Sequence, residues 1–141
     1  MGEYRTIKGY DSFAKRKLTR SMEDYLEMIC RLSREEGFAR VAQLSARLNV
    51  RASSASKMAE QLRDAGYLEY EKYGYLRPTE MGWKEGEYLL HRHEVLHDFL
   101  CMVNGSTDEL EQVEQIEHFF NRKTIENLER MLNQCHECRR E

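Results

Sequence analysis

Two carboxylates and an imidazole occur within five residues, at Glu114, Glu117 and His118. On an α-helix, positions i, i+3 and i+4 share one face, so these three side chains would point the same way. Asp24 and Glu27 repeat the i, i+3 spacing near the start of the chain. Clustered carboxylates repel one another unless a cation compensates them. The spacing therefore favours a divalent metal site to which both segments contribute.

His93 lies between the two segments and completes a set of four carboxylates and two imidazoles. Oxygen and nitrogen donors suit Mn²⁺ and neighbouring divalent ions, whereas structural zinc sites are usually rich in thiolates. Each residue also has an ordinary explanation when taken alone. Asp24 can favour a helix N-terminus, Glu27 and the later glutamates can be solvated, and His93 can pack against Tyr25. Two divalent ions would cancel the four negative charges, so we expect a looser metal-free form.

The composition predicts a soluble, helix-rich chain, with 33% charged residues, one proline and eight glycines among 141 residues. No apolar run approaches the roughly 20 residues that span a bilayer, and no signal-peptide pattern opens the chain. We therefore expect a cytoplasmic protein with no membrane partner. Four scattered cysteines do not form a disulfide framework, and the segment from Cys135 to Cys138 is interpreted as a loose tail or half of an intermolecular metal site.

The first part of the chain has the order of a winged helix-turn-helix. Apolar periodicity predicts helices over about 21–36, 42–48 and 53–65, and a period-two pattern predicts a short hairpin over 67–77. Ser21 is the expected cap of the first helix, and Ser53 or Ser54 that of the third. Residues 1–20 are expected to form a flexible basic arm, followed by the DNA-binding domain over 21–79.

Helices fill the rest of the chain in this prediction. One long helix begins after Thr79 and runs to about Val103, Thr107 caps the next, and the last covers about 121–134. Residues 1–92 carry 17 Lys and Arg against 14 Asp and Glu, whereas residues 93–141 carry 5 against 11. A mildly basic part followed by an acidic part fits DNA binding followed by cation binding.

The third helix is the expected recognition helix, which enters the major groove of double-stranded DNA. Short donors and basic residues on its exposed side suit contacts to phosphates and base edges, and the flanking basic residues suit phosphates. The same residues could merely solvate the surface. The candidate DNA contacts are Arg40, Arg51, Ser53, Ser54, Ser56, Lys57, Lys72 and Arg77.

Four stretches resemble the diphtheria toxin repressor family, and most closely its manganese transport regulator branch. They are Ser21-Met22-Glu23-Asp24-Tyr25-Leu26-Glu27, Glu71-Lys72-Tyr73, Arg92-His93-Glu94 and Val113-Glu114-Gln115-Ile116-Glu117-His118. The resemblance implies a mainly α protein in which a winged helix-turn-helix domain precedes an all-helical metal-binding and dimerisation domain over 80–141. It also implies a homodimeric, manganese-responsive repressor of metal-uptake genes.

The same resemblance assigns a pair of Mn²⁺ ions to Asp24, Glu27, His93, Glu114, Glu117 and His118, with Fe²⁺, Zn²⁺, Co²⁺ or Cd²⁺ as possible substitutes. Iron-responsive relatives have a cysteine at the position of Glu114 and a methionine at that of Asp24.

Three alternatives stay open. An iron- or zinc-responsive repressor of the same family would share the ligand set, and a winged-helix regulator without metal could use its acidic helix to bind a protein. A metal-dependent hydrolase is the third, because two bridged metals can activate water. Against the hydrolase, the sequence offers no spare base beside the motif and little chain for a substrate cleft.

Overall fold

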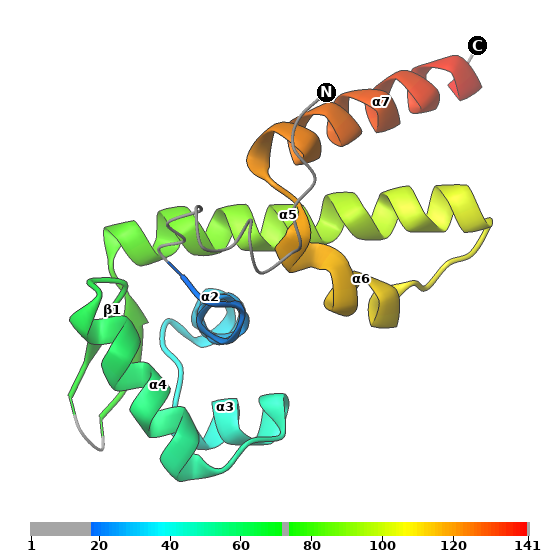
Figure 1. The fold of residues 1–141 in the computed structure, drawn as a ribbon. Coiled ribbons are helices and arrows are strands. Elements are labelled where there is room, and N and C mark those ends of the chain that lie inside the picture. Colours follow the sequence, from blue (N-terminus) through cyan, green and yellow to red (C-terminus); the bar gives the residue numbers. More distant parts are fainter. Residues whose placement is uncertain (1–17, 72–73, 141) are drawn as a thin grey trace, which may run out of the picture.

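The computed structural model describes residues 18–71 and 74–140, the last four without their side chains. Most of the predicted basic arm, Lys72 and the side chain of Cys138 therefore lie outside the described residues. The described part is mainly helical, as predicted, with one antiparallel hairpin (Figure 1). Its elements are α2 (Arg20–Glu36), α3 (Val41–Leu48), α4 (Ala52–Asp64), β1 (Leu68–Tyr70), β2 (Leu76–Pro78), α5 (Glu80–Asn104), α6 (Leu110–Ile116), the 3-10 turn η1 (Glu117–Phe119) and α7 (Arg122–Arg140).

Helix α2 begins one residue earlier than the sequence predicted. The Thr19 hydroxyl accepts a hydrogen bond from the Met22 amide at 3.2 Å, so Thr19 is the cap and Ser21 lies inside the first turn. Leu18, just before the cap, is buried, and this anchoring of the chain moves the helix start. Gly37 ends the helix as predicted, with φ of 86°, in the left-handed region that glycine adopts at low cost.

Helix α4 has no side-chain cap. Arg51 occupies the cap position in an extended conformation, so the prediction of Ser53 or Ser54 as cap was wrong, and both serines are exposed in the first turn. The preceding turn sets this start, because Asn49 has φ of 53° and the Val50 amide donates to the Ser45 carbonyl. Ala55, Ala59 and Leu62 form the buried face. Small residues here let α4 pack closely against its neighbours.

The predicted hairpin is present but shorter than the alternating pattern. β1 pairs antiparallel with β2, with Leu68 opposite Pro78 and Tyr70 opposite Leu76. Ala39 joins the edge through two hydrogen bonds of 2.8 Å with the backbone of Leu76. This bridge ties the segment between α2 and α3 to the hairpin, which forms the wing.

Helix α5 links the part of the molecule formed by α2, α3, α4 and the hairpin to the part formed by α6 and α7. It has 25 residues and is therefore about 37 Å long. Thr79 caps it, accepting from the Gly82 amide at 3.1 Å, and Gly105 ends it in the left-handed region. Figure 1 shows α2, seen end-on, below the first half of α5, α6 beneath its second half, and α7 above. Gly86 permits the close α2–α5 contact, because a Cβ there would lie 2.2 Å from the Sγ of Cys30.

The segment after α5 departs from the prediction. Thr107 is not a cap: α6 begins at Leu110 after Glu109, whose amide donates to Nε2 of His97 at 3.2 Å. This contact holds the chain outside the helix until residue 110. The helix also stops at Ile116, and Glu117 and His118 lie in the tighter turn η1. The predicted single helical face for all three ligands is therefore wrong in detail.

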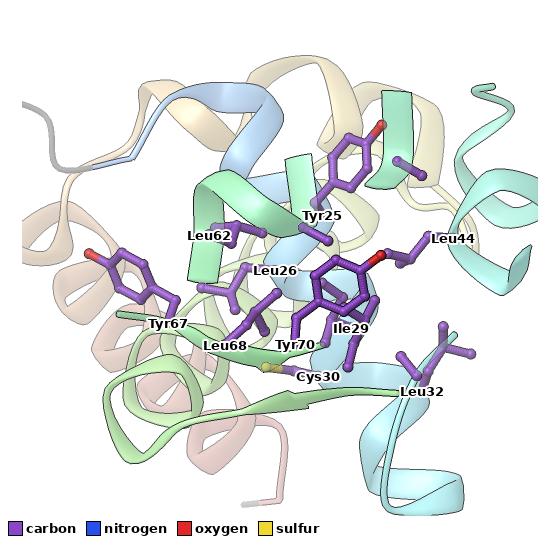
Figure 2. Packing of buried hydrophobic residues seen from close by; sticks show 14 of the residues in the cluster. Tyr25, Leu26, Ile29, Cys30, Leu32, Leu44, Leu62, Tyr67, Leu68 and Tyr70 are labelled. Atoms are coloured by element: carbon purple, nitrogen blue, oxygen red, sulfur yellow. The ribbon is translucent and has the colours of Figure 1, made fainter. Parts of the chain in front are cut away.

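Two apolar clusters fill the interior. The first joins α2, α3, α4 and the hairpin to the first half of α5, and Figure 2 shows leucines and tyrosines from these elements packed around Leu26, Ile29 and Cys30. The second lies between the later half of α5, α6 and α7 and contains Leu96 and Ile125. Because α5 contributes to both, it can transmit a change in one part to the other. In the described residues, no helix has the length and apolar character of a membrane span.

Candidate metal centre and DNA-binding face

The structure brings the predicted metal ligands together where α2, α5 and η1 meet. Two groups of three each place one donor atom per residue within 4.8 Å of the others, and both include Glu117. The first group adds Asp24 and His118, and the second adds Glu27 and His93. A carboxylate common to two triads could bridge a pair of ions.

Glu117 supports a cation at this position. Its side chain is fully buried, and its Oε1 has no hydrogen-bond partner among the described residues. Its Oε2 lies 2.9 Å from Nδ1 of His93, and Oε1 lies 3.8 Å from Nε2 of His118. A buried carboxylate oxygen without a partner is costly, and a metal ion would satisfy it. The residues present therefore fit a divalent metal.

Glu27 is a second buried carboxylate, only 7% exposed. Burial, followed by the nearby charge of Glu117, raises its pKa to about 7. Arg31, one turn later on α2, opposes this shift through a hydrogen bond of 2.9 Å from Nη2 to Oε1 of Glu27. In the metal-free protein this arginine therefore supplies part of the missing positive charge.

His118 is held between two carboxylates of α2. Its Nε2 lies 2.9 Å from Oδ1 of Asp24, and its Nδ1 lies 3.0 Å from Oε1 of Glu23. The hydrogen bonds to Asp24 and Glu23 raise its pKa to about 9, against the opposing effect of burial. The hydrogen bond with Glu117 likewise raises the pKa of His93. Near neutral pH the metal-free centre therefore holds protons that a metal ion must displace.

Glu23 and Arg92 belong to this centre, although the sequence reasoning did not include them as functional residues. Arg92 is 2% exposed, and its Nη1 lies 3.3 Å from Oε2 of Glu23. In the neutral imidazole of His118, a proton on Nδ1 that is donated to Glu23 leaves the lone pair of Nε2 free on the side of Asp24. Carboxylates beside metal sites commonly orient a metal-binding histidine in this way. Their positions in the sequence could have indicated this role. Glu23 precedes Asp24 and lies one turn before Glu27, and Arg92 precedes His93.

Glu114 lies at the rim of the centre. Its side chain is 52% exposed and its Oε1 is 3.7 Å from Nδ1 of His93. Partial burial, followed by the charge of Glu117, raises the pKa of its carboxyl group. Glu114 is outside both triads, so the structure places five predicted ligands in the triads and the sixth beside them.

Four of the predicted DNA contacts, Arg40, Ser53, Ser56 and Lys57, line a cleft of about 890 Å³ between α4 and the wing. On α4, Arg51, Ser53, Ser54 and Lys57 are exposed. Ser56 is half-buried, with its hydroxyl 3.1 Å from that of Tyr70 in β1. This contact connects the helix to the hairpin, so Ser56 has a structural role whether or not it also contacts DNA.

The wing and the segment before α3 supply the other basic residues. Arg40 and Arg77 are exposed there. Arg40 lines the same cleft as Ser53 and Lys57. Basic and hydroxyl side chains around a groove beside a protruding helix are suited to a phosphate backbone.

Comparisons with known proteins agree with both halves of this description. Residues 17–76 match the family described as iron dependent repressor, N-terminal DNA binding domain. Residues 79–141 match the family described as iron dependent repressor, metal binding and dimerisation domain. The two matches together cover most of the chain.

Curated relatives include HTH-type transcriptional regulators named MntR. The protein from Oceanobacillus iheyensis is 39% identical over 116 residues, which are 82% of this chain and 79% of the relative. The one from Geobacillus kaustophilus is 41% identical over 111 residues, or 78% of this chain and 79% of the relative.

Solved structures with the same fold include T. acidophilum IdeR, with a TM-score of 0.65 and 28% identity, and the manganese regulator SloR, with a TM-score of 0.68 and 25% identity. Each comparison covers 82% of this chain. This chain spans about half the length of those two proteins, at 55% of each.

Proposed function

We propose that this chain, which belongs to the iron dependent repressor family, is a manganese-responsive repressor of metal-uptake genes. Its relatives are DNA-binding transcriptional regulators, and it is accordingly a regulator that depends on a divalent metal, not an enzyme. The observation that carries the proposal is the buried Glu117 carboxylate common to two ligand triads. These triads join α2 of the DNA-binding part to η1 of the metal-binding part.

Manganese is favoured by the chemistry of the donors. Oxygen at positions 24 and 114 makes the ligand set hard, with four carboxylates and two imidazoles and no sulfur. Two ions per subunit would match the two triads and would cancel the four negative charges. Fe²⁺, Zn²⁺, Co²⁺ and Cd²⁺ can use the same donors, and Zn²⁺ can bind more tightly than Mn²⁺ without activating as well, because affinity follows the Irving–Williams order.

The proposed mechanism is preorganisation of a homodimer on double-stranded operator DNA. A bound divalent ion supplies the positive charge that the buried carboxylates lack. Asp24 and Glu27 extend from the DNA-binding domain over 21–79, whereas His93, Glu117 and His118 extend from the dimerisation domain over 80–141. When these side chains are held together, α4 keeps a fixed position relative to the dimer. The two recognition helices can then match successive major-groove faces, about 34 Å apart.

This arrangement raises DNA affinity without adding a contact to DNA. A flexible free protein loses conformational freedom when it binds the operator, and a protein already held rigid loses less. Operator binding also implies that the protein works in the cytoplasm, with the chromosomal DNA.

A DNA-binding assay with buffered metal ions tests the proposal. Duplexes taken from upstream of metal-uptake genes are titrated with the full chain in Mn²⁺, Fe²⁺, Zn²⁺ or a chelator. We expect Mn²⁺ to raise operator affinity at least tenfold, corresponding to a coupling of about 1.4 kcal/mol. Equal affinity with Mn²⁺ and with chelator would refute the manganese-responsive function, and stronger activation by Fe²⁺ or Zn²⁺ would reassign the metal.

Two variants locate the effect. Glu114→Ala should leave the fold intact and remove the Mn²⁺ dependence, because Glu114 is exposed at the rim of the centre and near His93. Glu111→Ala is the matched control, since Glu111 is an exposed glutamate one turn earlier on the same helix. A control that loses its Mn²⁺ response to the same extent would show that general helix charge, not ligation, is responsible.

A further inference from the structure

An aromatic pair lies beside the cleft, formed by Phe38 before α3 and Tyr75 in the turn between β1 and β2. The rings of Phe38 and Tyr75 have centroids 4.3 Å apart and planes tilted by 39°. Tyr75 is 46% exposed and therefore contributes little to the apolar core. A large exposed ring next to a proposed binding groove calls for an explanation other than core packing.

Two arginines lie over the rings of this pair. The guanidinium carbon of Arg40 lies 5.4 Å from the centroid of Phe38 and 5.2 Å from that of Tyr75. That of Arg77 lies 5.7 Å from the centroid of Tyr75. These distances fall within the range of cation–π attraction. Within the described residues, neither arginine forms an ion pair with a carboxylate, so both guanidinium groups keep their charge available for a ligand.

The backbone beneath the four side chains is fixed by hydrogen bonds. Ala39, between Phe38 and Arg40, exchanges two bonds of 2.8 Å with Leu76, between Tyr75 and Arg77. The Arg40 amide also donates to Oε1 of Gln43 at 2.9 Å, at the start of α3. Two three-residue segments therefore lie antiparallel, each with an aromatic residue on one side of the bridge and an arginine on the other.

Phosphate recognition benefits from such support. A long arginine side chain on a surface loses rotamer freedom when it contacts a phosphate, and a stacked guanidinium has already lost part of it. In general, a guanidinium group that lies over a ring can keep its N–H donors available at its edge. Arg40 and Tyr75 line the cleft together with Ser53 and Lys57 of α4.

We propose that Phe38 and Tyr75 are positioning residues that hold two arginines ready to contact the phosphate backbone of DNA: Arg40, which lines the cleft between α4 and the wing, and Arg77, which lies over Tyr75. This inference rests on the proposed DNA-binding function and adds to it the two aromatic residues, neither of which contacts DNA through base edges. They act on affinity for any duplex and leave sequence preference unchanged.

The test measures binding of the full chain, with Mn²⁺ present, to a labelled duplex of random sequence by fluorescence anisotropy. Tyr75→Leu should weaken binding roughly three- to tenfold, because both arginines would then lose more rotamer freedom when they contact a phosphate. Tyr75→Phe keeps the ring and should bind within about twofold of the unmutated protein. Phe38→Leu, which leaves Tyr75 in place, should weaken binding less, because only Arg40 stacks on Phe38.

A double-mutant cycle separates positioning from a direct or structural role. In a background carrying Arg40→Ala and Arg77→Ala, Tyr75→Leu should change affinity by less than about twofold. The two arginine replacements should lower the slope of log affinity against log salt concentration by about two, one for each lost phosphate contact. Thermal unfolding of each variant confirms that the wing is folded.

The outcomes distinguish this inference from the proposed function. If the unmutated protein binds no duplex of any sequence, the DNA-binding function itself fails. If it binds, but Tyr75→Leu equals Tyr75→Phe, or its effect persists fully without the arginines, the positioning role is overturned and the function stands.

Discussion

Metal binding should release about one proton per subunit near neutral pH, and this prediction tests the electrostatics of the centre directly. The hydrogen bonds that His118 donates to Asp24 and Glu23 raise its pKa to about 9. A metal ion binds the neutral imidazole, so the extra proton must leave. The perturbation is therefore addition of Mn²⁺ to metal-free protein at a fixed pH.

The magnitude follows from the two pKa values. At about pH 7.5, a group with a pKa of about 9 is mostly protonated, and Glu27, with its pKa raised to about 7, is partly protonated. His118 thus contributes nearly one proton, and Glu27 and His93, whose pKa values are also raised, add to the release. Between about pH 7 and 9, apparent metal affinity should rise about tenfold for each pH unit, because one proton competes with the metal.

Calorimetric titration with Mn²⁺ in buffers of different ionisation enthalpy measures the protons released. His118→Gln should reduce the release by about one proton. His91→Gln is the control, since His91 is an exposed residue of α5 whose carboxylate neighbour is Glu129 on α7, outside the centre. Mn²⁺ binding that releases no proton from the unmutated protein near pH 7.5 would refute the reasoning, because His118 would then be neutral before the metal arrives.

Three further predictions concern stability. Glu117→Gln should abolish the rise in Tm on adding Mn²⁺, because it removes the carboxylate common to both ligand triads; a variant that still gains Tm from Mn²⁺ would contradict this shared role. Gly86→Ala should destabilise the fold by about 1–3 kcal/mol, since the new Cβ would lie 2.2 Å from Cys30 Sγ; urea midpoints equal to those of the unmutated protein would show that α2 and α5 can separate freely. In chelator, the free energy of unfolding should fall by on the order of 2–4 kcal/mol from about pH 6 to 9. The reason is that the pKa values of His118 and Glu27 are higher in the folded than in the unfolded protein, so the folded protein binds the extra protons that are lost as the pH rises. A rise over that interval would mean that other groups dominate.

The element order was predictable because its signals are local. The period switch at the wing, the Thr79 cap and the glycines at 37 and 105 each act within a few residues of the position that they determine. Helix starts at Ser21 and Thr107 were predicted wrongly because each depends on tertiary packing, of Leu18 into the first core cluster and of the Glu109 backbone against His97. Leu18 is buried and Thr19 takes the capping role, and His97 on α5 binds the amide of Glu109.

The candidate centre shows the same division between local and distant causes. Residue type and spacing were sufficient to select six ligand candidates, and their role as ligands stays a prediction. Spacing alone could not reveal that the helix tightens after Ile116, because an α-helix and a 3-10 turn accept the same residues. The tighter turn gives Glu117 and His118 different neighbours from those of a straight helix.

Glu23 illustrates why a ligand list is an incomplete description of the centre. Its Oε2 contacts Arg92, which is always charged, and its Oε1 contacts His118. The imidazolium of His118 loses one proton when metal binds. Arg31 has the corresponding place beside Glu27. The metal-free centre is thus neutralised by protons and arginines, not left as a cluster of bare charges. The carboxylates are therefore neutralised in both forms, by protons and arginines without metal and by the metal ion when it is bound. The free-energy difference between these two forms depends on pH as well as on the concentration of Mn²⁺.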